Sequence, residues 1–405
     1  MTTASERSRF GDVFAIGEFR ALWLAYLVSV AGDQLALVAV TVLVYNRTHS
    51  PLLSALAYSA GFLPWVIGGV SLSRLADAYP RRAVMVACDV IRIFLVAAMA
   101  LPGTPLWTLI LLLAVVTLLD SPFRAARSAM LPDILSGDRY VMGTATMQIT
   151  NRIGRTAGFA VGGALVAAVG ARSALSADSA TFAVSALLLR IGVQGRPAAA
   201  SPRRPSPSGK DRPERFLAVR QVFGDARLRT LMLLGWLIPF YVVPEGVAVP
   251  YAHLLHGGSR AAGLVLASGP AGAIVGSAAF SRFVDPARRL RWMGPMAVCS
   301  CAVLSLCLLG PPLAASLAIF ATAAAFSAYQ LAANAAFVAA VPSSWRGQAF
   351  GLANGGMNVG QSAWFIAAGA LASVISPAVV IALSGLIGTA VAAMLAIAWR
   401  DTTAG

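Results

Sequence analysis

Charged residues are scarce in this sequence. They make up 12% of the 405 residues, where an average soluble domain has about 25%, and apolar residues make up 58%. Cysteine is rare too, because the chain has only four, all inside apolar segments and without zinc-type spacing to the three histidines. We also find no P-loop and no nucleophile–base pair. These absences argue against a soluble domain, a disulfide framework, a metal site, a nucleotide-driven pump and an enzyme.

Long apolar runs dominate instead. Runs of roughly twenty mostly apolar residues are long enough to cross a hydrocarbon core of about 30 Å as helices, and they do not alternate as barrel strands do. Turn residues such as Pro102-Gly103 and Gly310-Pro311-Pro312 separate them. We therefore predict an all-α membrane protein, in contact with the lipid bilayer, whose twelve transmembrane helices cover residues 20–44, 52–74, 83–101, 105–127, 140–169, 173–192, 229–254, 260–281, 290–310, 312–338, 347–374 and 377–399.

The basic residues predict the orientation of these helices. With a cytoplasmic N-terminus, the expected inner loops, tails and adjoining helix ends hold all 31 basic residues except Arg47, Arg172 and Arg260, which fall outside, and Arg92, Arg152 and Arg155, which fall deeper within helices. This positive-inside asymmetry predicts an inner-membrane protein with both termini in the cytoplasm. It also explains the net charge of +15 without nucleic acid, for which no folded basic module is present. A charged stretch of about twenty residues precedes the first run, so we expect no cleavable signal peptide.

The chain divides into two halves that repeat each other. Residues 193–228 carry five prolines and too little apolar surface to fold, which predicts a cytoplasmic linker between bundles at 1–192 and 229–405. Ser73-Arg74-Leu75-Ala76-Asp77 recurs 208 positions later as Ser281-Arg282-Phe283-Val284-Asp285, and Gly163-Ala164-Leu165 recurs 206 positions later as Gly369-Ala370-Leu371. Two pseudo-symmetric six-helix bundles form a transporter architecture in which rocking exposes a midplane site to each side in turn.

Several motifs along the chain resemble those of one known family. The first helix carries Phe19-Arg20-Ala21-Leu22-Trp23 and Gly32-Asp33, the fourth ends in Asp120-Ser121-Pro122-Phe123-Arg124-Ala125-Ala126-Arg127, and Arg346-Gly347 opens the eleventh. In this order and spacing they resemble the major facilitator superfamily, in the branch of bacterial drug, macrolide and siderophore efflux proteins. The resemblance covers essentially the whole chain and implies the major facilitator fold and a secondary transporter.

The resemblance extends to two signatures of that superfamily. Its loop signature, roughly G-x-L-A-D-R-x-G-R-R, is partly kept in Asp77, Arg81 and Arg82, and implies a cytoplasmic latch in which Asp77 caps helix 11 near Arg346 and Arg81 pairs with Asp120. The alternative is a loop held only by the positive-inside rule. Its antiporter signature in helix 5 is matched by Gly154, Gly158, Gly162 and Gly163, with Phe159 in place of the signature's proline. This match favours antiport. The alternative is that these small residues only allow close packing between the halves.

Acidic residues inside the bilayer are costly and are therefore functional candidates. Asp33 lies in the middle of helix 1 and is the first candidate to carry a coupling proton, with a structural hydrogen bond as the alternative. Glu245 follows a proline in helix 7 and is the second candidate, unless it lies near the outer end in water. We interpret Asp89 and Arg92, three residues apart, as a structural pair, and Asp178 as structural.

Polar stripes indicate where a substrate passes. We expect two of them, on helices 5 and 11 and related by the 206-residue offset, to line a water-filled cavity: Gln148, Asn151, Arg152 and Arg155, and Asn354, Asn358 and Gln361. The alternative is that Arg152 and Arg155 extend to the cytoplasm. Helices 7 and 10 add aromatic and amide side chains that either contact substrate or only pack, namely Trp236, Tyr241, Tyr329, Gln330 and Asn334.

These patterns predict a monomeric, proton-coupled exporter of a small amphipathic molecule such as an antibiotic or another natural product, of the kind that confers multidrug resistance. Protons would be the coupling ion, and we expect no cofactor and no metal. Uptake or facilitated diffusion of a small metabolite is the second hypothesis, and a non-transporting scaffold or receptor is the third. Buried polar stripes are costly without a pore, which argues against the third. Substrate and direction cannot be read from the sequence.

Overall fold

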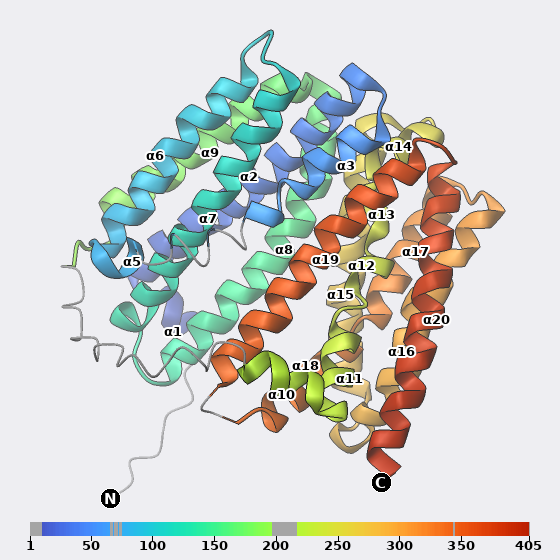
Figure 1. Ribbon diagram of the computed structural model, residues 1–405. Coiled ribbons are helices and arrows are strands. Elements are labelled where there is room, and N and C mark those ends of the chain that lie inside the picture. The colour runs from blue at the N-terminus through green and yellow to red at the C-terminus, as the bar shows by residue number, and fades with distance from the viewer. Residues whose placement is uncertain are drawn as a thin grey trace, which may run out of the picture. The chain divides into compact units, whose positions relative to one another are not determined.

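The computed structural model describes residues 10–64, 68, 72, 75–196, 217–342 and 345–404 (Figure 1). Every regular element in these ranges is a helix. The first half of the chain contributes α1 (Phe10–Phe14), α2 (Gly17–Thr48), α3 (Pro51–Ser59), α5 (Leu75–Ala78), α6 (Arg81–Ala100), α7 (Leu106–Ile134), α8 (Asp138–Val169) and α9 (Ala171–Gly192).

The second half contains shorter pieces. Its elements are α10 (Leu217–Gly224), α11 (Ala226–Gly235), α12 (Ile238–Tyr241), α13 (Val243–Gly246), α14 (Ala248–Leu254), α15 (Gly258–Phe283), η2 (Pro286–Arg288), α16 (Arg289–Ala302), η3 (Val303–Leu309), α17 (Leu313–Phe326), α18 (Tyr329–Ala340), α19 (Arg346–Ala372) and α20 (Pro377–Ala404).

Each of the twelve expected runs coincides with one helix or with consecutive helices, and the second run is described only in part. Within the described ranges, nine helices or helix groups are long and apolar enough to cross a membrane. Two further helices, α8 with 32 residues and α19 with 27, have the length but are not among the nine. They are the two helices that carry the polar stripes.

Contacts group the chain into two compact units. The first comprises Met1–Leu43 with Ala60–Arg203, and the second comprises Val44–Ser59 with Arg204–Gly405. The helix α3 therefore packs with α13, α14 and α19 of the second unit, although the sequence repeat assigns it to the first half. The linker predicted at 193–228 lies mostly outside the described residues, and the predicted bundle boundaries stay a prediction.

In the first unit, α6 lies alongside α9 and α7, and α8 is held against α2 by glycine. A Cβ added at Gly154 would lie 3.0 Å from Val30 Cγ1, and one at Gly158 would lie 2.9 Å from Gln34 Cβ. One turn further, Gly162 faces the backbone of α2, and Gly163 is buried beside it. This glycine row therefore brings two helices of the same half together.

Two glycines in the second unit allow an equally close approach of α15 and α17. A Cβ at Gly272 would lie 2.0 Å from the carbonyl oxygen of Ala321, and one at Gly276 would lie 2.1 Å from that of Ala325. Backbone atoms fill the space that a methyl group would need. Only hydrogen fits at these two positions.

The seventh expected helix is divided into α11, α12, α13 and α14. Pro239, Pro244 and Pro250 lie within the last three pieces, and proline removes a backbone donor and clashes with the preceding turn. The carbonyl of Leu234, near the end of α11, accepts hydrogen bonds from Tyr329 Oη at 3.0 Å and from Gln330 Nε2 at 3.2 Å. Side chains of α18 thus satisfy backbone groups that the break releases.

Candidate functional site

Arg92 of α6 is the centre of a group of charges inside the first unit. Its side chain is fully buried, with Nη2 3.5 Å from Asp120 Oδ1 of α7 and Nη1 3.9 Å from Asp89 Oδ1. The guanidinium also lies over the rings of Phe123 and Phe182, at 5.4 and 5.3 Å from their centroids. None of its three nitrogens has a hydrogen-bond acceptor among the described residues. Ion pairs and aromatic rings, rather than hydrogen bonds, therefore stabilise this charge.

The acids around Arg92 differ in how well they are satisfied. Asp89 Oδ2 accepts a 2.6 Å hydrogen bond from Ser185 Oγ of α9. Asp178 of α9 accepts a 3.0 Å hydrogen bond from Thr181 at Oδ1, but its buried Oδ2 has no partner within the described ranges. An unsatisfied, fully buried carboxylate oxygen is energetically costly.

Asp33 reaches this group from α2. Its neighbour Gly32 lies so close to α9 that an added Cβ would be 2.1 Å from Asp178 Oδ1 and 2.3 Å from Thr181 Oγ1. The Asp33 side chain is half-buried, and the charges that act on it are those of Arg92, Asp120, Arg124 and Asp89. The first coupling candidate is therefore surrounded by ionisable groups of other helices, which its own helix does not reveal.

Two further arginines on α7 complete the group. Arg124 Nε pairs with Asp120 Oδ2 one turn away. Arg127 lies over the ring of Tyr26, 3.5 Å from its centroid, and the Tyr26 hydroxyl accepts a 2.7 Å hydrogen bond from Asn151 Nδ2 of α8. The polar stripe of α8 thus connects, through Tyr26, to these charges.

We call this group the charge cluster, and define it as Asp33, Asp89, Arg92, Asp120, Arg124, Arg127 and Asp178. It holds four carboxylates and three guanidinium groups, so one carboxylate has no positive counterpart. No three of its acids are placed to hold a metal ion, nor are any other described His, Cys, Asp or Glu residues. Such a cluster becomes electrically neutral by binding one proton.

The residues of the expected latch lie apart in this structure. Arg81 pairs with Asp133 and donates to Ala129 O at 2.7 Å, while Arg82 donates to Val193 O at 3.1 Å. Because α6 and α7 are antiparallel neighbours, the start of α6 meets the end of α7, about 20 Å along the helix from Asp120 at 1.5 Å per residue. Asp120 pairs with arginines of the charge cluster instead. The side chain of Asp77 lies outside the described residues.

Glu245 lies in the second unit, on α13. It is 8% exposed, and its Oε2 accepts a 2.8 Å hydrogen bond from the hydroxyl of the fully buried Tyr58 on α3. The Tyr58 ring meets Phe365 of α19 edge-on at 5.3 Å, and Gly269 of α15 leaves room for Oε1. The alternative of a water-exposed carboxylate at a helix end is therefore wrong, because four helical segments enclose this acid.

The polar stripes differ in exposure along their length. Gln148 and Arg152 of α8 and Asn354 of α19 are exposed, whereas Gln361 is buried. Arg155 is half-buried within 6.0 Å of the Phe62 and Phe159 ring centroids, and Asn358 donates a 2.8 Å hydrogen bond to the carbonyl of Asn354. Each stripe offers polar groups at the surface of its own unit.

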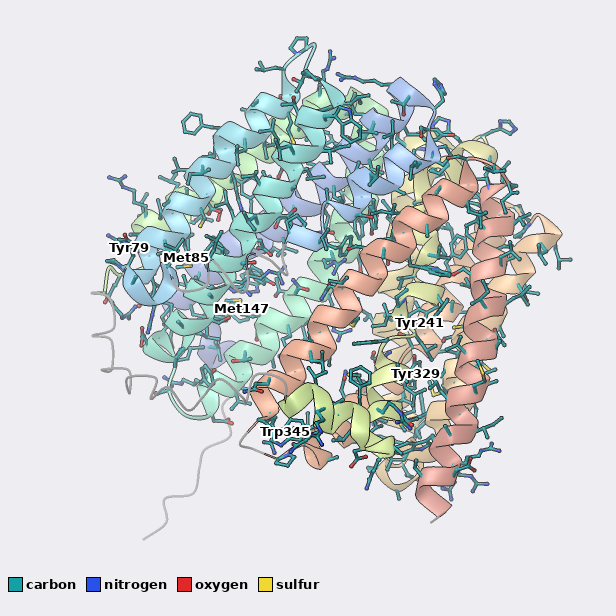
Figure 2. All side chains as sticks on the ribbon, viewed as in Figure 1. Tyr79, Met85, Met147, Tyr241, Tyr329 and Trp345 are labelled. Atoms are coloured by element: carbon teal, nitrogen blue, oxygen red, sulfur yellow. The ribbon has the colours of Figure 1, made fainter. Side chains whose placement is uncertain are left out.

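The aromatic and amide candidates of helices 7 and 10 mostly satisfy backbone groups. Tyr329 and Gln330 bind the carbonyls at the end of α11, and Trp236 Nε1 donates to Ala353 O at 2.9 Å. Tyr241 is buried near Tyr329 in the second unit, as the labels in Figure 2 indicate, while Asn334 is exposed on α18. These contacts hold the divided helix 7 in place.

Sequence reasoning missed two members of the site. Arg124 and Arg127 appeared only within a motif, and the closeness of Asp178 to Asp33 was not foreseen. A signal for Arg124 existed, because it follows Asp120 by four residues and so lies on the same face of the helix. The closeness of Asp178 to Asp33 depends on the approach at Gly32, which no sequence spacing reveals.

Comparison with solved structures shows the same architecture in several transporters. The chain superposes on a POT family transporter in complex with a thioalcohol-conjugated peptide, with a TM-score of 0.72 at 10% identity, covering 94% of this chain and 95% of that one. A bacterial homologue of the human lysosomal transporter Spinster, inward-facing and occupied, gives 0.72 at 14% identity over 98% and 97%. The nucleoside transporter NupG gives 0.68 at 14% identity over 94% and 98%. At these identities the likeness concerns the fold.

Sequence comparison identifies a relative and a family. An uncharacterized MFS-type transporter of Bacillus subtilis (strain 168), YfiS, is 28% identical over 163 residues, which are 40% of this chain. The chain thus matches 39% of the length of that relative. The model of the Major Facilitator Superfamily matches residues 22–322. The predicted all-α fold of two six-helix bundles is confirmed, and the chain is a multi-pass membrane protein that belongs to the Major Facilitator Superfamily.

Proposed function

We propose that this transporter is a proton-coupled exporter of small amphipathic molecules such as antibiotics or other natural products. The observation that carries the proposal is the composition of the charge cluster, in which four carboxylates face three guanidinium groups inside a membrane-spanning unit. Burying an unpaired carboxylate in a membrane is costly, and a proton removes the cost. A cluster with one excess acid therefore changes its charge reversibly when it exchanges one proton.

Asp33 is the proton carrier of this proposal, and Glu245 is the alternate. Asp33 is half-buried, and its carboxylate is subject both to the positive charges of Arg92 and Arg124 and to the negative charges of Asp120 and Asp89. Glu245 is enclosed and hydrogen-bonded to Tyr58. Protonation of either acid weakens interactions that depend on its charge, which biases the conformational change of the transport cycle.

The substrate path of this proposal follows the polar stripes of α8 and α19. Both helices are long enough to span a membrane, yet they are not among the nine most apolar spans of the described chain. A polar membrane helix needs neighbours other than lipid, and water or substrate supplies them. Export, rather than uptake, is supported by the motifs that resemble the efflux branch.

Uptake or facilitated diffusion is the second candidate function, and structural similarity to NupG, described as a nucleoside transporter, favours it. Growth of cells with and without the protein on a panel of macrolides and other toxic natural products first identifies an exported compound. That compound, radiolabelled, is then loaded into vesicles carrying the purified protein. Efflux is measured with and without an imposed pH difference.

The pH difference should stimulate efflux by the wild type and not by Asp33→Asn, which should still exchange substrate downhill. Asp285→Asn is the matched control, because Asp285 is an exposed acid outside the cluster, with a side chain 75% exposed. Equal stimulation of wild type and Asp33→Asn would remove Asp33 from the mechanism. Loss of stimulation in Glu245→Gln alone would transfer the role to helix 7. Absence of transport in either direction would favour the scaffold hypothesis.

A further inference from the structure

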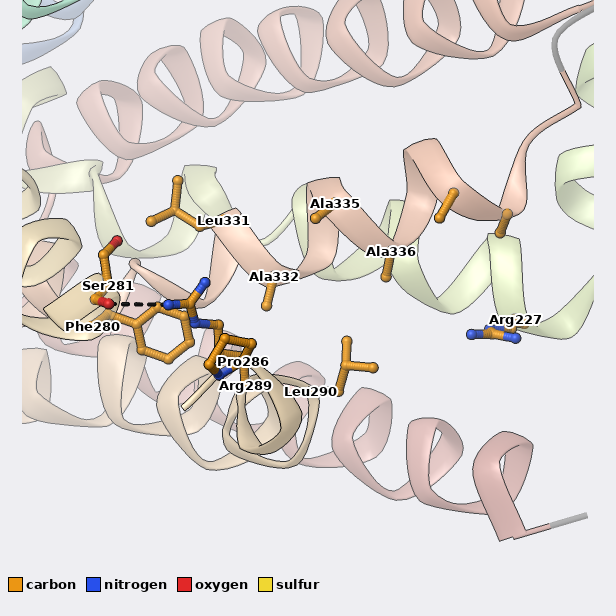
Figure 3. A pocket seen from close by; sticks show the side chains of 12 residues that line it. Arg227, Phe280, Ser281, Pro286, Arg289, Leu290, Leu331, Ala332, Ala335 and Ala336 are labelled. Atoms are coloured by element: carbon orange, nitrogen blue, oxygen red, sulfur yellow. Dashed lines mark hydrogen bonds between the residues drawn. The ribbon is translucent and has the colours of Figure 1, made fainter. Parts of the chain in front are cut away.

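A crevice of about 620 Å³ lies in the second unit, and neither Glu245 nor any residue of the polar stripes lines it (Figure 3). One wall is a face of α18 that is built mainly of alanine, including Ala332 and Ala335. The end of α15 contributes Phe280, and the start of α16 contributes Leu290. Arg227 of α11 and Arg289 of α16 border the crevice, and Figure 3 shows them toward opposite ends of the row of lining side chains.

The crevice is apolar along its walls and positive at its edges. Arg289 donates from Nη2 to Ser281 O at 3.0 Å and from Nε to Val284 O at 3.1 Å, which fixes its guanidinium against the turn. Arg227 is exposed. None of the lining residues is acidic. The crevice is therefore bordered by positive charge, and none of its lining residues is a carboxylate that could neutralise this charge.

The internal repeat shows what this site lacks. Arg289 lies 208 positions after Arg81, and Arg81 pairs with Asp133 at the end of α7. The second-half counterpart of α7 ends in α18, whose residues Tyr329–Ala340 include no acid. The nearby Asp285 lies within 4.0 Å of Arg288 instead. The first half thus neutralises its arginine internally, whereas the second half presents the equivalent arginine to an alanine-lined space.

We propose that this crevice binds one anionic phospholipid, whose phosphate takes the place of the missing carboxylate and whose acyl chain lies along the alanine face of α18. A phospholipid combines both properties that the site requires, an apolar chain and an anion. Guanidinium groups are well suited to phosphate because they offer several donors in a fixed plane. Basic residues at this end of the helices match the anionic surface of the cytoplasmic leaflet. The proposal depends on the membrane location of the chain and not on its substrate.

The test uses the full-length protein reconstituted in phosphatidylcholine vesicles with a small fraction of phosphatidylglycerol that carries a photoreactive group in its acyl chain. After illumination, adducts are mapped by mass spectrometry. We expect adducts on α18 and on the α15–α16 turn, and several-fold fewer with a phosphatidylcholine probe of the same chain. Arg227→Gln and Arg289→Gln should each lower labelling by about tenfold, as for the loss of one hydrogen bond to a charged group. Arg282→Gln, an exposed arginine beside the crevice that does not line it, should leave labelling unchanged.

A second pair of variants tests whether a carboxylate on the protein itself replaces the lipid phosphate. Ala335→Asp places a carboxylate in the crevice and should lower phosphatidylglycerol labelling, whereas Ala335→Asn, of nearly the same size, should not. This pair keeps the test decisive even where Arg289→Gln fails to fold, because Ala335 is exposed and lies outside the turn. Equal labelling by the two lipid probes, unchanged labelling in Arg227→Gln and Ala335→Asp, or adducts elsewhere would overturn the proposal. Displacement of the probe by inorganic phosphate would identify a soluble anion as the ligand and overturn it too.

Discussion

Replacing Tyr58 by phenylalanine removes one hydroxyl group from the second unit and leaves the aromatic ring in place. The hydroxyl donates a 2.8 Å hydrogen bond to Glu245 Oε2, while the ring keeps its edge contact with Phe365. Because α3 belongs to the first half of the repeat but packs on α13, α14 and α19, relative motion of the halves must separate these partners or bend the chain beside α3. We predict that the partners separate, so that the hydrogen bond exists in one state of the transport cycle and not in the other.

The size of the effect follows from the chemistry of this bond. A buried hydrogen bond to a charged group contributes about 1.5–3 kcal/mol. If the bond forms in only one state, its loss shifts the equilibrium between the states by roughly 10- to 150-fold, since each 1.4 kcal/mol is a factor of ten. Tyr58→Phe should accordingly favour the state in which α3 has left α19.

Distances between spin labels in lipid vesicles measure this shift. One label at Asn46, before α3, and one at Val374, after α19, report on the contact, and both positions are exposed. Tyr251→Phe is the matched control, because Tyr251 is equally buried in the same unit but its hydroxyl bonds to Ser316 Oγ, at 2.7 Å. It should lower stability slightly and leave the distance distribution unchanged.

The outcome that refutes the reasoning is specific. If Tyr58→Phe leaves the label distances unchanged in vesicles where the wild type visits both states, the Tyr58–Glu245 bond persists through the cycle. If Tyr251→Phe shifts them as strongly, the effect is one of general stability and not of the bond to the acid.

Three further predictions concern packing, the latch and topology. Gly272→Ala and Gly276→Ala should each lower the free energy of unfolding by about 1–3 kcal/mol, because their Cβ atoms would meet backbone oxygen. The control Gly355→Ala, whose Cβ would have no atom within 4 Å, should be neutral or stabilising, and thermal unfolding in detergent measures all three. Asp77→Asn should slow transport while leaving membrane insertion and substrate affinity intact. If this variant transports as fast as the wild type, the loop serves only to set the membrane topology. Reporter fusions at Pro207 and at the C-terminus should both report cytoplasm, and an outside signal from either would contradict two bundles of six helices.

The helices were predictable from the sequence because hydrocarbon imposes their length and apolar character. The expected run 105–127 and the observed α7 (Leu106–Ile134) agree at the start and differ at the end, because a helix continues into water where hydropathy no longer marks it. The division of helix 7 was foreseen only at Pro244. The assignment of α3 to the second unit was not foreseen, since it depends on contacts between segments far apart in sequence.

The site was predictable residue by residue but not as an assembly. Asp33 and Glu245 stood out because carboxylates are rare in membrane helices. Their partners did not, because Tyr58 reaches Glu245 from another helix and Asp178 approaches Asp33 only through the absence of a side chain at Gly32. For Arg81, the family resemblance implied Asp120 as the partner. In this structure the antiparallel packing of α6 and α7 places Arg81 next to Asp133 instead.

The division of helix 7 has a mechanical consequence. A continuous helix is stiff and transmits force from one end to the other, but this one is interrupted twice between Gly235 and Val243. Some of its backbone hydrogen bonds there span three residues instead of four, as from Phe240 to Leu237. We expect the breaks between α11, α12 and α13 to take up a rotation of α14 before it reaches α11. Tyr329 and Gln330 bind the carbonyl of Leu234 in α11 and hold this helix in place. We therefore expect the chain around Glu245 to rearrange while the far end of the same helix keeps its contacts with α18.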